Sequence, residues 1–204
     1  MDLKTHWDAI YTSKGPTAVS WYQPEPRVSL DLIARARITP GVEVIDVGGG
    51  ASTLVDTLLA QHYQHVSVLD ISPAAIEQAR SRLGDAANAV TWIEADITDV
   101  ALPQAHYDLW HDRAVFHFLT DPAARDAYIQ AVRQSVKPGG HVIVATFALD
   151  GPTHCSGLEV VRYSPDSLRD TFGAGFELVE SRNEIHHTPA HAEQSFIYCH
   201  CRRQ

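Results

Sequence analysis

The chain has no apolar run that approaches the roughly 20 residues needed to cross a bilayer, and its first residues lack the segments of a signal peptide. We therefore expect a cytoplasmic protein with no membrane partner. Positive charge is also scarce, because the 204 residues include only three lysines and carry a formal net charge of −9. Nucleic-acid binding normally relies on clustered lysine and arginine, so DNA and RNA are not expected as partners.

Cysteine is rare too, and the three cysteines cannot all pair with one another. Cys199 and Cys201 should point to the same face of a strand, and reduced thiols are the simpler interpretation. Histidine is more common, but the group near the C-terminus lacks the familiar Cys-x-x-Cys and His-x-x-x-His ligand spacings. We expect no metal site there and interpret the group as the solvated face of a hairpin: His186, His187, His191, Cys199, His200 and Cys201.

The overall composition is that of one soluble globular unit. Hydrophobic residues make up 45% of the chain and charged residues 20%. We expect a single domain over 1–204, in which 1–40 form an N-terminal helical or lid segment and 41–204 form the core.

The most informative stretch joins two apolar runs to a glycine-rich turn. Val44 to Val47 and Val66 to Asp70 are typical of buried parallel strands, and Gly48, Gly49 and Gly50 lack the Cβ atoms that would keep a ligand from the backbone. A dinucleotide fingerprint would need a third glycine where Thr53 stands, so that pattern is broken. The remaining Asp-x-Gly-x-Gly resembles motif I of the class I S-adenosylmethionine (SAM)-dependent methyltransferases, with Ser52 in place of their third glycine.

This resemblance implies roles for two acids at strand ends. Asp46 would lie near the methionine part of SAM, whose sulfonium and ammonium it would attract, and Asp70 would hold the ribose hydroxyls. The next strand ends at Asp96 and Ile97, which in the family meet the adenine. The implied cofactor-binding set is Asp46, Gly48, Gly49, Gly50, Ser52, Asp70, Ile71, Asp96, Ile97, His111 and Trp21.

The order of elements predicts the fold class. Apolar strands alternate with helices through most of the chain, and two strands near the C-terminus have no helix between them. We expect an α/β protein with a Rossmann-like, doubly wound, mostly parallel seven-stranded sheet and a C-terminal antiparallel hairpin. The expected strands are 44–47, 66–70, 90–96, 107–111, 141–147, 176–182 and 194–200; helices are expected at 53–62, 74–83 and from Pro122 to Lys137.

The fourth strand ends in a stretch where a methyl acceptor should approach the cofactor. His111 or His117 could take a proton from a nucleophile, and Asp112 could orient the cofactor or an amine, so these three are the candidate catalytic residues. Methyl transfer is an in-line displacement that a thiolate or amine can carry out unaided. Packing or capping is therefore the alternative role for both histidines.

The polar lead-in before the first strand is unusually aromatic. Its side chains could enclose a cation or bind the acceptor, or they could pack an N-terminal helix onto the core. With Arg113, they form the candidate substrate-binding set: Trp7, Tyr11, Trp21, Tyr22 and Gln23.

Together with 110–118, this lead-in resembles small bacterial methyltransferases akin to the citrate synthase-lysine methyltransferase family. The expected function is methyl transfer from SAM, with S-adenosylhomocysteine (SAH) as product, to a small molecule or a protein side chain. The Asn/Asp-Pro-Pro-Tyr sequence of exocyclic-amine enzymes is missing after the fourth strand, and no cysteine stands there for attack on a pyrimidine. The alternatives are a SAM/SAH sensor without turnover and a nicotinamide-dependent oxidoreductase.

Overall fold

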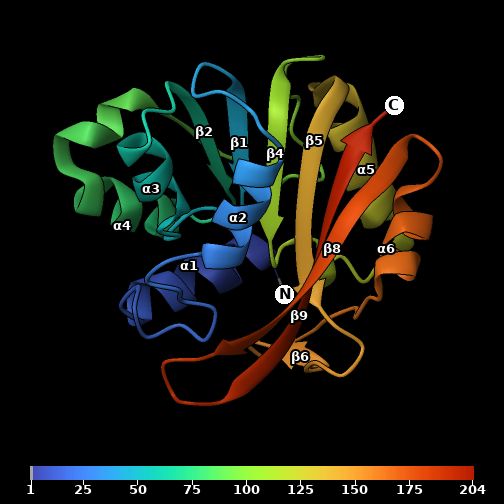
Figure 1. Ribbon diagram of the computed structural model, residues 1–204. Helices are drawn as coiled ribbons and strands as arrows, with labels where there is room; N and C mark the ends of the chain where they lie inside the picture. Colours follow the sequence, from blue (N-terminus) through green and yellow to red (C-terminus); the bar gives the residue numbers. More distant parts are fainter. Residues whose placement is uncertain (1) are drawn as a thin grey trace.

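A computed structural model describes residues 2–204 and contains a seven-stranded sheet in the order β3-β2-β1-β4-β5-β9-β8 (Figure 1). The first five strands in this order pair in parallel, whereas β9 pairs antiparallel with both β5 and β8. The expected doubly wound sheet with a C-terminal hairpin is confirmed. The strands are β1 (Glu43–Val47), β2 (His65–Asp70), β3 (Val90–Glu94), β4 (Tyr107–Arg113), β5 (Val136–Phe147), β8 (Phe176–His187) and β9 (Glu193–Arg203).

Helices cover both faces of this sheet, and short elements complete the chain. The α-helices are α1 (Leu3–Ser13), α2 (Arg27–Arg35), α3 (Leu54–Ala60), α4 (Pro73–Leu83), α5 (Pro122–Ser135) and α6 (Pro165–Phe172). The 3-10 helices are η1 (Gly84–Ala89) and η2 (Phe116–Phe118), and β6 (His154–Cys155) pairs with β7 (Leu158–Glu159). Among residues 2–204, no helix is long and apolar enough to cross a membrane.

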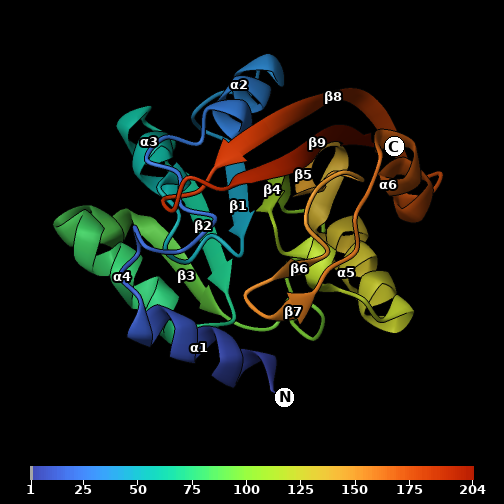
Figure 2. The ribbon, with the colours of Figure 1, turned by 90° about the horizontal axis from the view of Figure 1, so that it is seen from below.

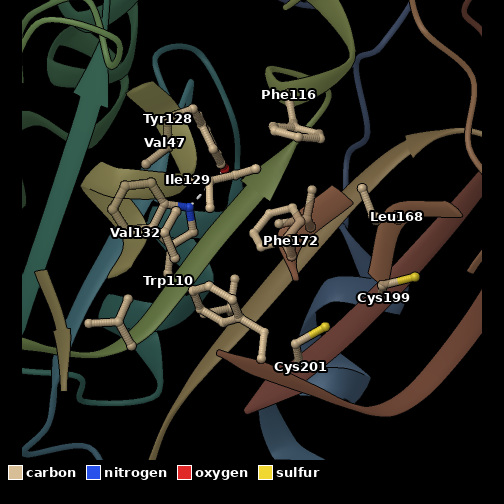
Figure 3. Close-up of a cluster of buried hydrophobic side chains, with 14 of the residues drawn as sticks. Val47, Trp110, Phe116, Tyr128, Ile129, Val132, Leu168, Phe172, Cys199 and Cys201 are labelled. Atoms are coloured by element: carbon tan, nitrogen blue, oxygen red, sulfur yellow. Dashed lines mark hydrogen bonds between the residues drawn. The ribbon is translucent and has the colours of Figure 1, made fainter. Parts of the chain in front are cut away.

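Two hydrophobic clusters hold these layers together. On one face α2 and α3 pack Leu32 and Leu58 against β1, β2 and β4, while on the other α5 and α6 pack their apolar sides against Trp110 and its neighbours (Figure 3). The alternation of side chains along each strand sends successive residues to opposite clusters, so a strand buried on both faces must be apolar almost throughout.

Three expectations need correction. Helix α5 ends at Ser135 and β5 begins at Val136, because Lys137 precedes a proline and is disfavoured in helical geometry. Helix α6 was not anticipated. The C-terminal hairpin does not present a solvated histidine face. Cys199, His200 and Cys201 are buried because β9 lies between β5 and β8, and His186 of β8 is buried with its Nε2 atom 2.7 Å from the carbonyl of Ser20. His187 and His191 are exposed.

The cysteines agree with the sequence interpretation. All three are free and buried, and Cys199 and Cys201 both belong to the cluster that faces α5 and α6. No group of three or more histidine, cysteine or acidic side chains within the described part of the chain is placed to hold a metal ion.

Candidate functional site

The main cavity opens at the edge of the sheet where β1, β2 and β4 end. Its lining residues border about 890 Å³ of space, part of which is open to solvent. Helix α1 and the β6–β7 hairpin lie at this edge, as seen from below in Figure 2. A second, smaller cavity adjoins it on the side of α2 and α3 and shares four lining residues with the first: Tyr11, Trp21, Gly48 and Arg113.

The turn after β1 consists of glycines that pack closely against neighbouring side chains. Gly48 has a φ of 68°, which favours glycine, and a Cβ atom there would lie 2.0 Å from Cγ2 of Val115. A Cβ atom on Gly49 would lie 2.4 Å from Oδ2 of Asp46. Gly50 lines neither cavity; its N–H instead donates to Oδ2 of Asp70 at 3.0 Å, so its influence on the site passes through Asp70.

Asp70, Ile71, Asp96 and Ile97 come together on one side of the main cavity, as the sequence predicts. Asp70 accepts hydrogen bonds from the N–H groups of Gly50 and Ser72, and burial raises its pKa to about 6. Asp96 uses its Oδ1 atom to accept from the N–H and hydroxyl of Thr98, at 2.8 and 2.7 Å. Two acidic side chains therefore border the space beyond β2 and β3.

The second cavity contains the other predicted acid, Asp46, together with Ser52 and His111. Oδ1 of Asp46 lies 2.7 Å from Nδ1 of His111, but its Oδ2 atom is buried and has no hydrogen-bond partner among residues 2–204. A buried carboxylate oxygen without a partner is costly in free energy. This orphan acceptor fits a positively charged group such as the ammonium of a bound amino acid.

His111 has no free ring nitrogen. Nδ1 pairs with Asp46, and Nε2 lies 2.8 Å from the hydroxyl of Ser29 on α2. These contacts fix the position of Asp46 and leave no lone pair for proton abstraction in the cavity. The proton-acceptor role that the sequence suggested for His111 is therefore not what its contacts favour.

Asp112 also departs from the sequence prediction, because it lines neither cavity. Its carboxylate accepts from the N–H groups of Val115 and Phe116 and from the hydroxyl of Tyr128, at 2.6 Å for the last. The direction of β4 sends this side chain toward α5, where it meets Tyr128. Asp112 thus holds the turn after β4 in place rather than orienting a ligand.

His117 does line the main cavity, and it is completely buried. Its Nδ1 atom accepts from the N–H of Phe147 at 3.3 Å, whereas Nε2 has no partner in the described structure. Burial, and then the charge of Arg113, lower the pKa of His117 to about 3. The ring is therefore neutral near pH 7, with its proton on Nε2, and it is a poor general base but an available donor.

The N-terminal aromatic residues both pack and line cavities, so the two interpretations of the lead-in describe one arrangement. Nε1 of Trp21 donates to the hydroxyl of Tyr11 at 3.1 Å, and Trp7 stacks edge-on against Trp21 and Phe118. Tyr22 and Gln23 line the second cavity.

Arg113 stands between the two cavities within a polar network that the sequence did not reveal. Its Nε atom donates to the hydroxyl of Tyr198, Nη1 donates to the carbonyl of Trp21, and Nη2 lies 3.5 Å from Glu184. Glu184 also accepts from the side-chain amide of Gln23 at 2.8 Å. The network therefore joins the C-terminal hairpin to the N-terminal lead-in across the site.

The far wall of the main cavity includes Phe147 and Cys155, which belong to the stretch 147–157 that the sequence suggests as a border of the acceptor site. Sequence reasoning missed the part of this wall that β9 supplies, Gln194 and Phe196. A signal was available, because an antiparallel strand brings its N-terminal residues to the edge where its parallel neighbour ends. In β9 these residues begin with Gln194, opposite the end of β5.

The geometry agrees with the sequence comparisons. Residues 44–140 match the family described as "Methyltransferase domain". This match covers slightly less than half of the chain and makes the stretch similar to a methyltransferase domain. The match includes the glycine turn and the strand ends that carry Asp46, Asp70 and Asp96, but it stops before Phe147.

Individual relatives act on different atoms, according to their names. The chain is 30% identical over 118 residues to the ubiquinone/menaquinone biosynthesis C-methyltransferase of Ralstonia pickettii, covering 57% of this chain and 47% of that protein. It is 32% identical over 111 residues to the malonyl-[acyl-carrier protein] O-methyltransferase of Anoxybacillus flavithermus, covering 54% and 40%. The chain thus spans about half the length of these curated relatives or less.

The similarity in fold extends across the whole chain. The N-methyltransferase NodS of Bradyrhizobium japonicum, solved in complex with SAH, superposes with a TM-score of 0.75 at 18% identity and covers 99% of both chains. This similarity establishes the fold. The narrower resemblance to citrate synthase-lysine methyltransferases stays a hypothesis.

Proposed function

We propose that the protein is a SAM-dependent methyltransferase that acts on a small molecule or a protein side chain. The observation that carries this proposal is the orphan Oδ2 atom of Asp46, buried in a cavity beside the glycine turn. A dinucleotide diphosphate would be repelled by this carboxylate, whereas an ammonium or sulfonium would be attracted. The broken dinucleotide fingerprint and this unpaired acceptor therefore both disfavour a nicotinamide cofactor.

The remaining donor-side residues fit the other parts of the same molecule. Asp70 would accept from the ribose hydroxyls, since its carboxylate lines the cavity where β2 ends. Asp96 and Ile97, one strand further, would meet the adenine. When bound, SAM would supply a methyl group on a positively charged sulfur.

The chain's own contribution to transfer is alignment and exclusion of water. Gly48 permits close approach at the boundary of the two cavities, and Trp7, Tyr11 and Trp21 cover them from the N-terminal side. Enforced alignment of reacting atoms can lower a barrier substantially without any acid or base. No proton transfer by His111 or Asp112 is needed in this scheme.

The test compares ligands with and without the amino-acid part that Asp46 would contact. Calorimetry of the wild type should show binding of SAM and SAH but not of NADH. The Asp46→Asn variant should bind SAH at least about tenfold more weakly, from loss of a charge-assisted contact, yet bind 5′-methylthioadenosine, which lacks the ammonium, with nearly wild-type affinity.

The matched control is Asp126→Asn, which removes the same charge from an exposed position on α5. A labelled-methyl assay over acceptor pools then separates an enzyme from a sensor that binds without turnover. Tight NADH binding without SAH binding would contradict the proposal, as would equal loss of both nucleosides in Asp46→Asn.

A further inference from the structure

The main cavity divides into two parts along the order of the strands. Asp70, Ile71, Asp96 and Ile97 lie beyond β2 and β3, whereas Phe147 and Phe196 come from β5 and β9 on the other side of β1 and β4. If the first part holds the nucleoside, the second part faces the transferable group. We call this second part the acceptor pocket, lined by Arg113, His117, Phe118, Phe147, Gln194 and Phe196.

Two polar atoms of the acceptor pocket lack partners. Nε2 of His117 carries the ring proton, because Nδ1 accepts from Phe147, and it finds no acceptor among residues 2–204. Oε1 of Gln194 is likewise buried without a donor there. Buried polar groups are normally hydrogen-bonded, so this donor and this acceptor fit a ligand that offers one acceptor and one donor in return.

The walls of the pocket are flat aromatic rings. His117 lies 4.5 Å from Phe118 and 4.7 Å from Phe147, and Phe147 lies 4.8 Å from Phe196, between ring centroids. Ring surfaces in contact with a ligand favour offset or edge-on packing of another ring. A planar acceptor therefore suits these walls better than a flexible chain.

The charges of the pocket disfavour an ammonium. The acidic residues that line the main cavity, Asp70 and Asp96, are on the nucleoside side, and the acceptor pocket contributes none. Its charged residue is Arg113, whose guanidinium lies 4.5 Å above the Phe196 ring and 3.5 Å from Glu184. Because Glu184 already pairs with Arg113, a lysine side chain would find no free carboxylate among the residues that line this pocket.

We propose, on the basis of the function proposed above, that the acceptor is a small planar conjugated molecule. It presents an oxygen or ring nitrogen to Nε2–H of His117 and an N–H or O–H to Oε1 of Gln194. Its nucleophilic lone pair forms the bond to the methyl carbon while the carbon–sulfur bond breaks and its electron pair stays on sulfur; any proton that the acceptor loses passes to water. His117 is then a binding donor that selects and orients the acceptor.

The lack of a basic group on this wall limits which nucleophilic groups of the acceptor can react. A neutral imidazole with a strongly lowered pKa does not remove a proton near pH 7. The acceptor must therefore attack through a group that needs no protein base, such as a ring nitrogen, a thiolate or an ionised phenol.

The experiment offers the wild-type protein two acceptor pools with labelled SAM. One pool is a deproteinised extract of the cells that produce the protein, and the other is the dialysed protein fraction of the same cells. Label should enter the deproteinised pool, in compounds that absorb ultraviolet light. Label confined to the dialysed proteins would overturn the planar acceptor but keep the methyltransferase, whereas no label in either pool would overturn the proposed function as well.

Variants at His117 provide the second readout. His117→Phe keeps the ring but removes the donor, and transfer should fall at least tenfold while SAH affinity stays unchanged. His117→Gln places an amide N–H near the same position and should restore transfer to within a few-fold of wild type. The control is His187→Phe, at an exposed position on β8. Wild-type transfer by His117→Phe would overturn the assignment.

Discussion

The N–H of Gly50 donates a hydrogen bond to the carboxylate of Asp70, which ties the turn after β1 to the end of β2. A Cβ atom on Gly50 would lie 2.4 Å from Oδ2 of Asp70 and 2.5 Å from Cβ of Ala75, and neither group is a flexible chain end. We expect Gly50→Ala to displace Asp70 and weaken SAH binding at least about tenfold, measured by calorimetry.

Gly41→Ala is the control for this change, because a Cβ atom on Gly41 meets nothing within 4 Å. It should leave both SAH affinity and the thermal midpoint close to wild type. Wild-type SAH affinity in Gly50→Ala would show that the position of Asp70 does not govern binding of the nucleoside.

The affinity for SAH should depend on pH through Asp70. Burial raises its pKa to about 6, so the folded protein holds this proton more tightly than an unfolded chain does, and Asp70 loses its charge as the pH falls through about 6. Only the anion can accept from both ribose hydroxyls. We expect affinity to fall about tenfold between roughly pH 7.5 and pH 5.

The contribution of Asp70 to the stability of the fold changes with pH in the opposite direction to its contribution to SAH affinity. Because the pKa of Asp70 is higher in the folded protein, this group adds stability at a pH below its pKa in the unfolded chain. That contribution is lost as the pH rises through the folded-state pKa of about 6.

The control for the affinity prediction is Asp70→Asn, which has no such proton, so its weaker SAH affinity should stay flat over the same pH range. A pH profile shared by wild type and Asp70→Asn would assign the titration to another group.

The hydroxyl of Tyr128 connects two buried groups of β4. It accepts from Nε1 of Trp110 at 2.9 Å (Figure 3) and donates to Asp112 at 2.6 Å. Tyr128→Phe leaves a buried indole N–H without a partner and removes a hydrogen bond to a carboxylate. We expect a loss of about 2–3 kcal/mol in the free energy of unfolding by urea.

Tyr63→Phe is the matched control, since the Tyr63 hydroxyl makes no hydrogen bond within the described residues. It should change the unfolding free energy by less than about 0.5 kcal/mol. If the network around Asp112 is structural, SAH affinity in Tyr128→Phe will match wild type once the protein is folded. A large drop in SAH affinity with an unchanged free energy of unfolding would instead show that Asp112 contributes to ligand binding.

The gathering of Asp70, Ile71, Asp96 and Ile97 at one cavity was predictable from sequence because its determinants are local. A strand, a glycine turn and a terminal carboxylate follow one another along the chain, and parallel pairing then gathers the ends of β1, β2 and β3 at one edge. Helix α6 carried a signal as well: Ser164 and Pro165 repeat the cap and proline of Ser72 and Pro73.

The acceptor side was not predictable in the same way because its determinants are distant in sequence. The protonation of His117 depends on the N–H of Phe147, and the role of Arg113 depends on Glu184 and Tyr198 in the hairpin. His111 and Asp112 are adjacent in sequence, yet β4 sends them to opposite faces, toward Asp46 and Tyr128. Residue type alone cannot choose between these environments.

The separation of the two sides along the sheet has a consequence for how such proteins diversify. In the proposed scheme, the residues that would hold the donor lie mostly before residue 98, while the wall that would meet the acceptor is encoded mostly after residue 112. Substitutions in β9 or at the end of β5 can therefore alter what is methylated without disturbing the methyl source. A hybrid that kept the first part and received a relative's later part would inherit a new substrate preference from a few exchanged side chains.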